Sequence, residues 1–360
     1  MNSTQSPPAV NRSSDNSGPQ DVLNGILSAS REGMLIVDSS MRITAANDPA
    51  HDVFGRRGQP LVGRRLTEVV REPHLHQAFQ QAVTESAPTD LKLELPSGVE
   101  RRSFDVHVAP IQLGGVCQAI GVFYDISKLE RLERVRQEFL SNISHELRTP
   151  LTSILAYVET LEDSAIDDPD NNRRFLAVIR RNAERMHGLI ADIAELSQIE
   201  SGNVSLDARE LHLSALVDEI FAAVSSKASG KDVVLVNDVP VESRVRADLM
   251  RLEQMITNLV DNAIKFNRPG GTVTVAVAVG SNDGSDLVSV ADTGEGIMSE
   301  NLHRIFERFY RIDRGRTRDV GGTGLGLAIV KHLARLHGGE VSVNSVLGQG
   351  TTFTIELPRD

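Results

Sequence analysis

Three side chains capable of acid–base or nucleophilic chemistry lie close together in FLSNISHELRTPL, residues 139–151. His145 is followed directly by Glu146, and Thr149 comes one helical turn later. A neutral imidazole can attack phosphorus through one ring nitrogen while an adjacent carboxylate holds the proton of the other. Pro150 lacks an N–H and clashes with the carbonyl one turn back, so we expect a helix that bends beside the histidine. The segment predicts a phosphoryl acceptor near a helix surface.

A second polar group lies in NLVDNAIKFN, residues 258–267. Asn258 and Asn262 are four residues apart and therefore share one face of a helix. Such amides can be buried and capped within an amphipathic helix, or they can bind a ligand. The helix alone leaves both interpretations open.

Two glycine-containing segments follow along the chain. DTGEGI, residues 292–297, comes after the apolar strand LVSVA, and a carboxylate at a strand end can accept the exocyclic amine of adenine. GGTGLGLAIV, residues 321–330, opens a predicted helix whose first N–H groups would lie at a positive helix end, where phosphates bind. The glycines that would permit tight turns and close backbone approach are Gly294, Gly296, Gly322, Gly324 and Gly326.

These four segments resemble those of sensor histidine kinases in type and in order, and the resemblance covers residues 130–360. It implies that His145 is the phosphoacceptor, modified to phosphohistidine, and that Glu146 assists it. It also implies that Thr149 orients water when such an enzyme removes phosphate from its partner. The alternative, that Thr149 merely precedes a proline in a bent helix, stays open.

The resemblance further implies an ATP site. Asn262 would coordinate the Mg²⁺ that bridges the ATP phosphates, and Asn258 would line the same pocket. Lys265 would meet phosphate as a compact cation, and Phe266 would lie against adenine. Asp292 would accept the adenine amine. The other implied ATP-binding residues lie in the glycine segments and the ATP lid: Gly294, Gly296, Arg311, Gly322, Thr323, Gly324, Leu325 and Gly326.

The segment RIFERFYRIDR, residues 304–314, precedes the last glycine segment and resembles the ATP lid of the same family. Phe306 and Phe309 would anchor it by burial. Around it, residues 211–360 have an α/β pattern that predicts an α/β-sandwich domain. The expected helices are 213–225, 247–266 and one from about Leu325, and the expected strands are 272–279, 286–292, 340–344 and 351–358.

The histidine is expected on a helical hairpin. From Ser127 to Asp163, apolar residues recur at steps of three and four. The polar run DSAIDDPDNN ends this helix, and a second helix ends near Ser201-Gly202. Two such helices bury little by themselves, so a dimeric four-helix bundle is the expected completion. The helix could also pass a signal from the preceding domain to His145.

Residues 21–125 carry five strand patterns and polar helical stretches, which predicts an antiparallel sheet with one covered face. With its closing strand FYDIS, the region resembles a PAS sensory domain. Cys117 lies in a predicted strand, unlike the helix cysteine of flavin photosensors. His74 or His76 could be nominated for haem, but both lie in a polar stretch. No PAS ligand is therefore predicted.

Composition limits the other possibilities. The 38 basic and 49 acidic residues give a net charge of −11, which disfavours nonspecific nucleic-acid binding. No apolar run is long enough for a membrane span, and the N-terminus has no apolar signal core. A single cysteine fits a reducing compartment, so a cytoplasmic location is expected.

The predicted architecture is multidomain α+β. Its expected parts are a disordered tail (1–20), a PAS-like sensory domain (21–126), a signalling helix with the dimerisation and phosphotransfer hairpin (127–203), and an ATP-binding catalytic domain (210–360).

The expected function is autophosphorylation from ATP, followed by transfer to an aspartate of a separate response regulator, with phosphatase activity toward that regulator. One alternative is a non-catalytic scaffold, or a phosphatase-dominant regulator, that binds ATP and the regulator. Others are a gyrase-type ATPase, disfavoured because Asn258 replaces that class's glutamate, and a serine or threonine kinase.

Overall fold

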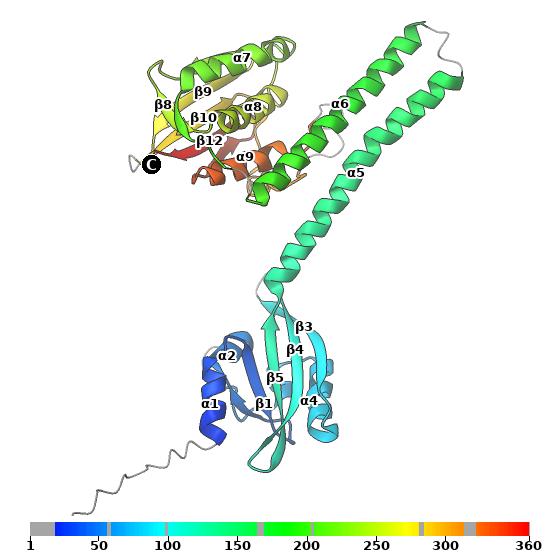
Figure 1. Ribbon diagram of the computed structural model, residues 1–360, viewed down its shortest axis with the longest axis vertical. Coiled ribbons are helices and arrows are strands. Elements are labelled where there is room, and N and C mark those ends of the chain that lie inside the picture. The colour runs from blue at the N-terminus through cyan, green and yellow to red at the C-terminus, as the bar shows by residue number, and fades with distance from the viewer. Residues whose placement is uncertain are drawn as a thin grey trace, which may run out of the picture. The chain divides into compact units, whose positions relative to one another are not determined.

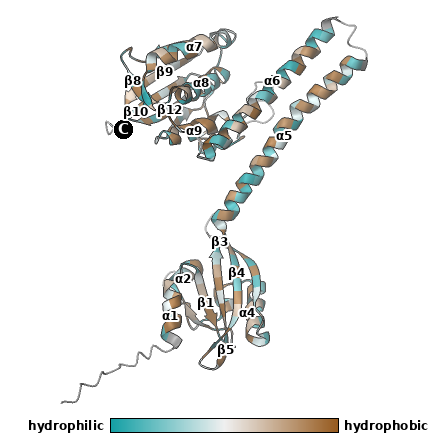
Figure 2. Cartoon of the chain, in the orientation of Figure 1, coloured by the Kyte–Doolittle hydropathy of each residue, from teal (hydrophilic) through white to brown (hydrophobic). Residues whose placement is uncertain are grey.

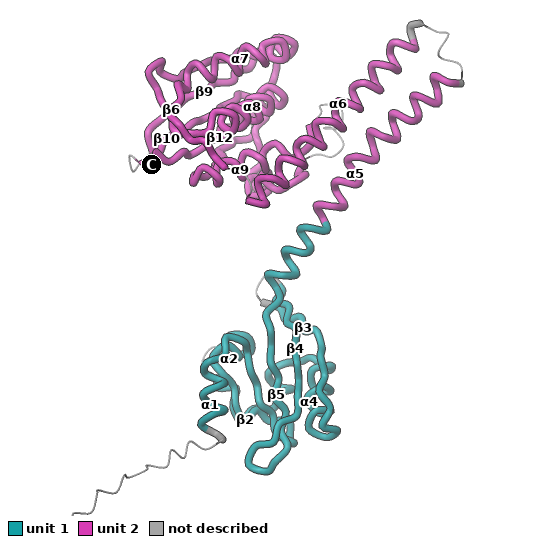
Figure 3. Tube along the Cα trace, in the orientation of Figure 1, with its two compact units in different colours: residues 1–137 teal, residues 138–360 magenta. Residues whose placement is uncertain are grey.

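The computed structural model describes residues 19–55, 59–97, 100–163, 169–202, 205–280, 284–312 and 322–359. It divides into two compact units, residues 1–137 and 138–360 (Figure 3). Several predicted features lie wholly or partly outside the described residues. They are the tail, the centre of the DSAIDDPDNN loop, the end of the lid segment and Gly321.

The first unit is built on one antiparallel sheet with strand order β2-β1-β5-β4-β3 (Figure 1). Alternate residues of β5 are buried, so one face of the sheet is covered, as the sequence predicts. The strands are β1 (Gly33–Val37), β2 (Ile43–Ala46), β3 (Thr89–Ser97), β4 (Glu100–Leu113) and β5 (Val116–Asp125). The helices are α1 (Pro19–Ala29), α2 (Asp48–Phe54), α3 (Leu66–Val69) and α4 (Pro73–Glu85).

The covered face of this sheet is filled by aromatic and aliphatic side chains. Phe79 of α4 is fully buried, and its ring lies directly on Gly121 of β5, where a Cβ atom would collide with it. Phe54 packs edge-on against Phe123 with 4.8 Å between ring centroids. The glycine at position 121 therefore allows α4 to pack closely on the sheet.

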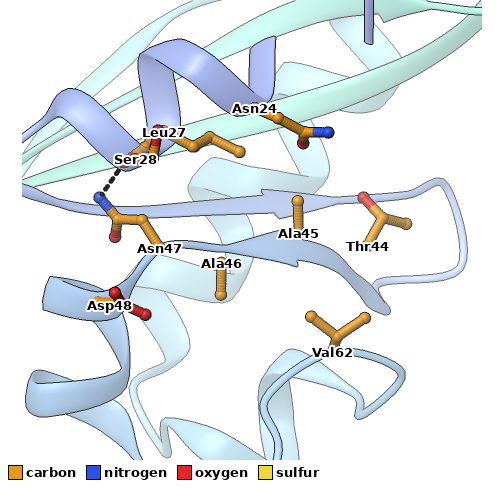
Figure 4. A pocket seen from close by; sticks show the side chains of 9 residues that line it. All are labelled: Asn24, Leu27, Ser28, Thr44, Ala45, Ala46, Asn47, Asp48 and Val62. Carbon is orange, nitrogen blue, oxygen red and sulfur yellow. Dashed lines mark hydrogen bonds between the residues drawn. The ribbon is translucent and has the colours of Figure 1, made fainter. Parts of the chain in front are cut away.

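Helix α1, which the sequence patterns did not predict, is joined to the sheet by Asn47. The amide nitrogen of Asn47 donates to the carbonyls of Leu27 and Glu32, at 3.1 and 2.8 Å. Its oxygen accepts from the backbone N–H groups of Met34 and Ala50. Asn47 also lines a cleft of about 340 Å³. Figure 4 shows its side chain together with those of Thr44 and Val62, which line the same cleft. One buried side chain thus joins α1, β1 and α2.

The hairpin consists of α5 (Ser127–Asp163) and α6 (Pro169–Glu200), close to the predicted ends. Helix α5 continues through Pro150, and the bend expected there stays a prediction. Tyr157 packs on Phe175 across the hairpin with 5.3 Å between ring centroids. Hydrophobic and hydrophilic residues alternate along both helices (Figure 2). Large apolar side chains that remain exposed on them are Leu129, Leu132, Val135, Leu140, Leu151, Leu155, Leu176 and Ile190.

The C-terminal part of the second unit is a mixed sheet with order β11-β12-β10-β9-β7, on which three helices pack (Figure 1). Strand β7 is parallel to β9, and the other neighbours are antiparallel. A separate pair, β6 and β8, is antiparallel. The helices are α7 (Leu213–Ser229), α8 (Leu249–Lys265) and α9 (Gly326–Leu336). The strands are β6 (Arg209–His212), β7 (Val234–Asp238), β8 (Arg244–Ala247), β9 (Thr272–Val279), β10 (Ser285–Asp292), β11 (Val341–Val346) and β12 (Gly350–Pro358).

Candidate functional site

The predicted phosphoacceptor lies on the surface of α5. The side chain of His145 is exposed, which leaves its ring accessible to a reacting group. The carboxylate of Glu146 turns toward α6, where its Oε2 accepts from Nη2 of Arg185 at 2.8 Å. The hydroxyl of Thr149 is also exposed and donates to the backbone carbonyl of His145 at 3.2 Å. The three predicted residues therefore lie within one turn of helix.

Helix α8 presents the two asparagines beside the glycine-rich start of α9. Asp248 caps α8 by accepting from the N–H of Arg251 at 3.2 Å, and an apolar face of the helix is buried in the core. Asn258 and Asn262 are half-buried. Their side chains make no hydrogen bond to any other residue in the described part of the chain. Because no fully buried side-chain nitrogen or oxygen of the described residues lacks a hydrogen-bond partner, the unpaired amide atoms of Asn258 and Asn262 are open to solvent or to a ligand.

The glycines at the start of α9 allow it to approach α8 closely. A Cβ at Gly326 would lie 3.3 Å from Oδ1 of Asn258. A Cβ at Gly322, whose φ is +118°, would lie 2.5 Å from Nζ of Lys265. Side chains at these positions would occupy the space beside the amide and the ammonium group. The structure thus brings together the asparagine segment and the glycine segment, which are far apart in sequence.

Lys265 is a half-buried cation at this junction. Burial is the main reason that its pKa falls from the ordinary 10.5 to about 8. The positive charges of Arg311, Lys231 and Arg185 lower the pKa further. Its Nζ also lies 4.7 Å from the ring centroid of Phe266. A cluster of cations favours the binding of an anion such as phosphate.

The lowered pKa of Lys265 predicts that replacing this residue changes both ATP binding and the pH dependence of stability. Lys265→Met is expected to weaken ATP binding about 10-fold or more at pH 7, because a charged contact to phosphate is lost. Between pH 8 and 10.5 the unfolded chain binds more protons at this lysine than the folded chain does. The native domain without nucleotide should therefore gain stability as the pH rises through that window, and the methionine variant should not show this gain.

Nucleotide titrations at pH 7 and pH 9, with thermal unfolding at both, measure these effects. ATP affinity of the native chain should fall several-fold at pH 9. With a pKa of about 8, Lys265 is then uncharged in about 90% of the molecules. Lys227→Met, which removes an exposed lysine paired with Asp261, is the matched control. Equal pH dependence in the native chain and the Lys265→Met variant would contradict the assignment.

Asp292 lies at the end of β10, and the loop after it contacts the end of α8. Its Oδ1 accepts from the backbone N–H groups of Gly294 and Thr351, at 2.8 and 3.3 Å. Both printed bonds use the same oxygen, so Oδ2 is available for an adenine amine. Burial raises the pKa of Asp292, and the two backbone bonds oppose that rise.

The loop after Asp292 folds back against the end of α8. The N–H of Glu295 donates to the carbonyl of Phe266 at 3.3 Å, and a Cβ at Gly294 would collide with that same oxygen. Gly296 has φ +71° and lies against the backbone of Val346. These glycines therefore place Phe266 and Asp292 close together, as an adenine site requires.

The lid segment is anchored as the sequence predicts. Phe309 is buried, and its N–H donates to the carbonyl of Gly324 at 2.9 Å. Phe306 is half-buried and packs edge-on against Phe353 with 6.2 Å between ring centroids. Arg311 follows this anchor, and its charge reaches Lys265.

Two of the predicted ATP-binding residues have other side-chain contacts. The hydroxyl of Thr323 donates to Oδ2 of Asp192 on α6 at 2.6 Å and accepts from the N–H of Leu325. The side chain of Leu325 is fully buried in the core. In this structure, Thr323 therefore connects the glycine segment to the hairpin.

Further contacts of α6 with the ATP-binding part were not predicted from the sequence. Glu195 pairs with Arg251 at 2.6 Å and also accepts from Gln254. Glu200 pairs with Arg308 and lies 3.4 Å from Nε2 of His332. Phe139 of α5 packs on Phe309 with 5.7 Å between centroids. The spacing of Asp192 and Glu195 places both on one face of the helix, which could have indicated a contact surface on α6. The spacing does not show that this surface meets the ATP-binding part.

One nominated haem ligand, His76, has a contact of its own within the domain. Nε2 of His76 lies 2.6 Å from the carbonyl oxygen of Val70. In the ranges that the structure describes, no three histidine, cysteine or carboxylate residues gather as metal ligands would. Cys117 lies in β5, as predicted, with its thiol 3.5 Å from the carbonyl of Val83.

Three family models match the chain. "Histidine kinase-, DNA gyrase B-, and HSP90-like ATPase" matches residues 247–360, "His Kinase A (phospho-acceptor) domain" matches 135–202, and "PAS fold" matches 27–131. With the fold and the site geometry, they define the class as a multidomain sensor kinase with an ATP-binding domain.

Curated relatives identify the family. The chain is 32% identical over 338 residues to a sensor protein kinase WalK of Staphylococcus aureus, covering 93% of this chain and 80% of that one. It is 28% identical over 340 residues to sensor protein SrrB of Staphylococcus aureus (strain N315), covering 94% of this chain and 56% of SrrB. The chain belongs to the sensor histidine kinases of two-component systems.

One solved structure extends the comparison of folds. Histidine kinase ThkA, in complex with response regulator protein TrrA, matches with a TM-score of 0.51 at 22% identity, covering 94% of this chain and 98% of that one. The chain spans about half the length of other curated relatives, 55% of a second WalK and 56% of SrrB. Among the helices described here, none is long and apolar enough to cross a membrane.

Proposed function

We propose that this chain is an ATP-dependent protein-histidine kinase that phosphorylates its own His145. The observation that carries the proposal is the junction of α8 and α9, where Oδ1 of Asn258 and the ammonium group of Lys265 lie against a glycine-rich helix start and Asn262 shares the helix face of Asn258. The proposed adenine acceptor, Asp292, precedes a loop that contacts the end of α8. An exposed histidine in the same compact unit supplies the nucleophile.

In the proposed reaction, a ring nitrogen of neutral His145 attacks the γ-phosphorus, and ADP leaves with the electron pair of the broken P–O bond. Glu146 would hold the proton of the other ring nitrogen. Asn258 replaces the glutamate that would activate water in a hydrolysing relative, which favours transfer over hydrolysis.

The amide oxygen of Asn262 fits a magnesium ligand. It is half-buried, has no partner among the described residues, and is the hard oxygen donor that Mg²⁺ prefers. Bound Mg²⁺ would neutralise charge on the ATP phosphates. Lys265 and the N–H groups at the start of α9 would hold the phosphates from the other side.

Labelling with γ-labelled ATP and Mg²⁺ tests the proposal. The native chain is expected to acquire label that is lost in acid and survives alkali, as a phosphohistidine does. Acid-stable label would indicate serine or threonine transfer instead. Absence of label despite measurable ATP binding would contradict autokinase activity and favour the scaffold alternative.

The proposed partners are a second copy of the chain and a response regulator. The exposed apolar side chains of α5 and α6 are the surface that a four-helix dimer would cover. The structurally similar ThkA is recorded in complex with a response regulator protein. We propose that phospho-His145 likewise passes its phosphoryl group to an aspartate of a separate regulator.

Phosphatase activity toward that regulator would depend on Thr149. Its exposed hydroxyl donates to the carbonyl of His145 at 3.2 Å, a weak bond that a water could replace. Thr149→Ala is expected to lower the dephosphorylation rate of the regulator about 10-fold or more, with autophosphorylation changed less than about threefold. Thr149→Ser should retain much of the activity. Equal losses of both activities would instead indicate a structural role in the helix beside Pro150.

A further inference from the structure

Arg185 lies on the face of α6 that meets the ATP-binding part of the chain. It precedes Asp192 by seven residues, about two helical turns, so the two side chains share a face. Asp192 binds the hydroxyl of Thr323 at 2.6 Å, and Thr323 follows Gly322, which lies against Lys265. The geometry thus directs Arg185 toward the region where the nucleotide phosphates are proposed to bind.

Arg185 is also paired with the residue next to the phosphoacceptor. Its Nη2 donates to Oε2 of Glu146 at 2.8 Å, and the side chains are only 23% and 32% exposed. By contrast, Arg180 and Glu184 on the same helix lie 3.9 Å apart with 77% and 71% of their side chains exposed. A shielded, short ion pair holds a side chain in one geometry far better than an exposed one does.

The electrostatics agree with this placement. The charge of Arg185 is among those that lower the pKa of Lys265, so the guanidinium group acts on the proposed phosphate site as well as on Glu146. Arg185 therefore contacts the residue next to His145, and its charge also acts on Lys265 of the proposed phosphate site.

We infer that Arg185 is a positioning residue for phosphoryl transfer: its guanidinium fixes one oxygen of Glu146 against α6, leaving the other oxygen oriented to hold the ring proton of His145. The inference rests on the proposed function. During transfer, the N–P bond forms at one ring nitrogen, the P–O bond to ADP breaks with its electron pair leaving on ADP, and the proton on the second ring nitrogen moves to the carboxylate of Glu146. Arg185 itself exchanges no proton.

The first test separates catalysis from binding. Arg185→Gln is expected to lower kcat of autophosphorylation about 10- to 100-fold, with a smaller loss of nucleotide affinity, about threefold, because its charge also reaches the proposed phosphate site. Arg185→Lys should recover part of kcat, because a point charge replaces the planar fork. Arg180→Gln, which removes the exposed pair on the same helix, is the matched control and should behave as the native chain.

The second test asks whether Arg185 acts through Glu146. The Glu146→Gln variant is compared with the Glu146→Gln, Arg185→Gln double variant by single-turnover labelling over hours. The added Arg185→Gln substitution should change the labelling rate less than about twofold. The same 10- to 100-fold loss in both backgrounds would overturn the inference, as would an unchanged kcat or a change confined to KM.

Folding and function are checked separately. If Arg185→Gln melts at a much lower temperature than the native chain, Arg185→Lys carries the test, and native kcat in that variant together with native stability would overturn the inference. Failure of the proposed function itself would be recognised differently, because the native chain would then acquire no acid-labile label.

Discussion

Replacement of His145 by alanine is expected to abolish autophosphorylation, lowering the labelling rate by a factor of about 1000 or more. The exposed imidazole is the proposed nucleophile, and His145 is the only histidine in the sequence of α5. ATP affinity should remain native, because the nucleotide would bind to α8, α9 and β10 and not to the hairpin. Labelling with γ-labelled ATP, followed by acid and alkali treatment, measures the first effect. Nucleotide titration measures the second.

The matched control is His187→Ala, which removes an exposed histidine from α6, the other helix of the hairpin. This variant should be labelled like the native chain. Acid-labile label that persists in His145→Ala and is lost in His187→Ala would move the acceptor site to α6. Label lost in both variants would indicate that the hairpin itself had been damaged, which thermal unfolding would detect.

The second large effect is expected from Asp292→Asn, which should weaken ATP binding about 30- to 100-fold. The asparagine oxygen can keep the two backbone bonds that Asp292 Oδ1 accepts from Gly294 and Thr351. Its NH₂ group would then take the position of Oδ2, and a donor would face the exocyclic amine of adenine. The loop should therefore stay folded while nucleotide recognition fails.

An exchange of nucleotide preference distinguishes this explanation from general damage. Inosine triphosphate carries a carbonyl in place of the adenine amine, so the Asp292→Asn variant should bind it better relative to ATP than the native chain does. Competition titrations with both nucleotides give this ratio. ATP affinity within about twofold of native would show that Asp292 does not contact the base.

Local patterns predicted most of the helices and strands, because the spacing of apolar residues is set by the period of each element. Helices α5 and α6 end close to where polar and glycine-containing runs interrupt their apolar spacing. Three strands were missed, β6, β7 and β8. They are four or five residues long, and β7 joins the sheet only by pairing with the distant β9. Helix α1 was missed as well, and its attachment depends on Asn47, which follows it by 18 residues.

The sequence by itself determined the family and the candidate residues, because phosphoryl transfer requires particular side chains at fixed local spacings. The tertiary structure decided which of them meet. It placed Gly322 against Lys265, buried that lysine enough to lower its pKa, and directed the hydroxyl of Thr323 to α6. The pairing of Arg185 with Glu146 joins residues 39 apart on two helices. Such contacts depend on how elements pack, and no local pattern encodes that packing.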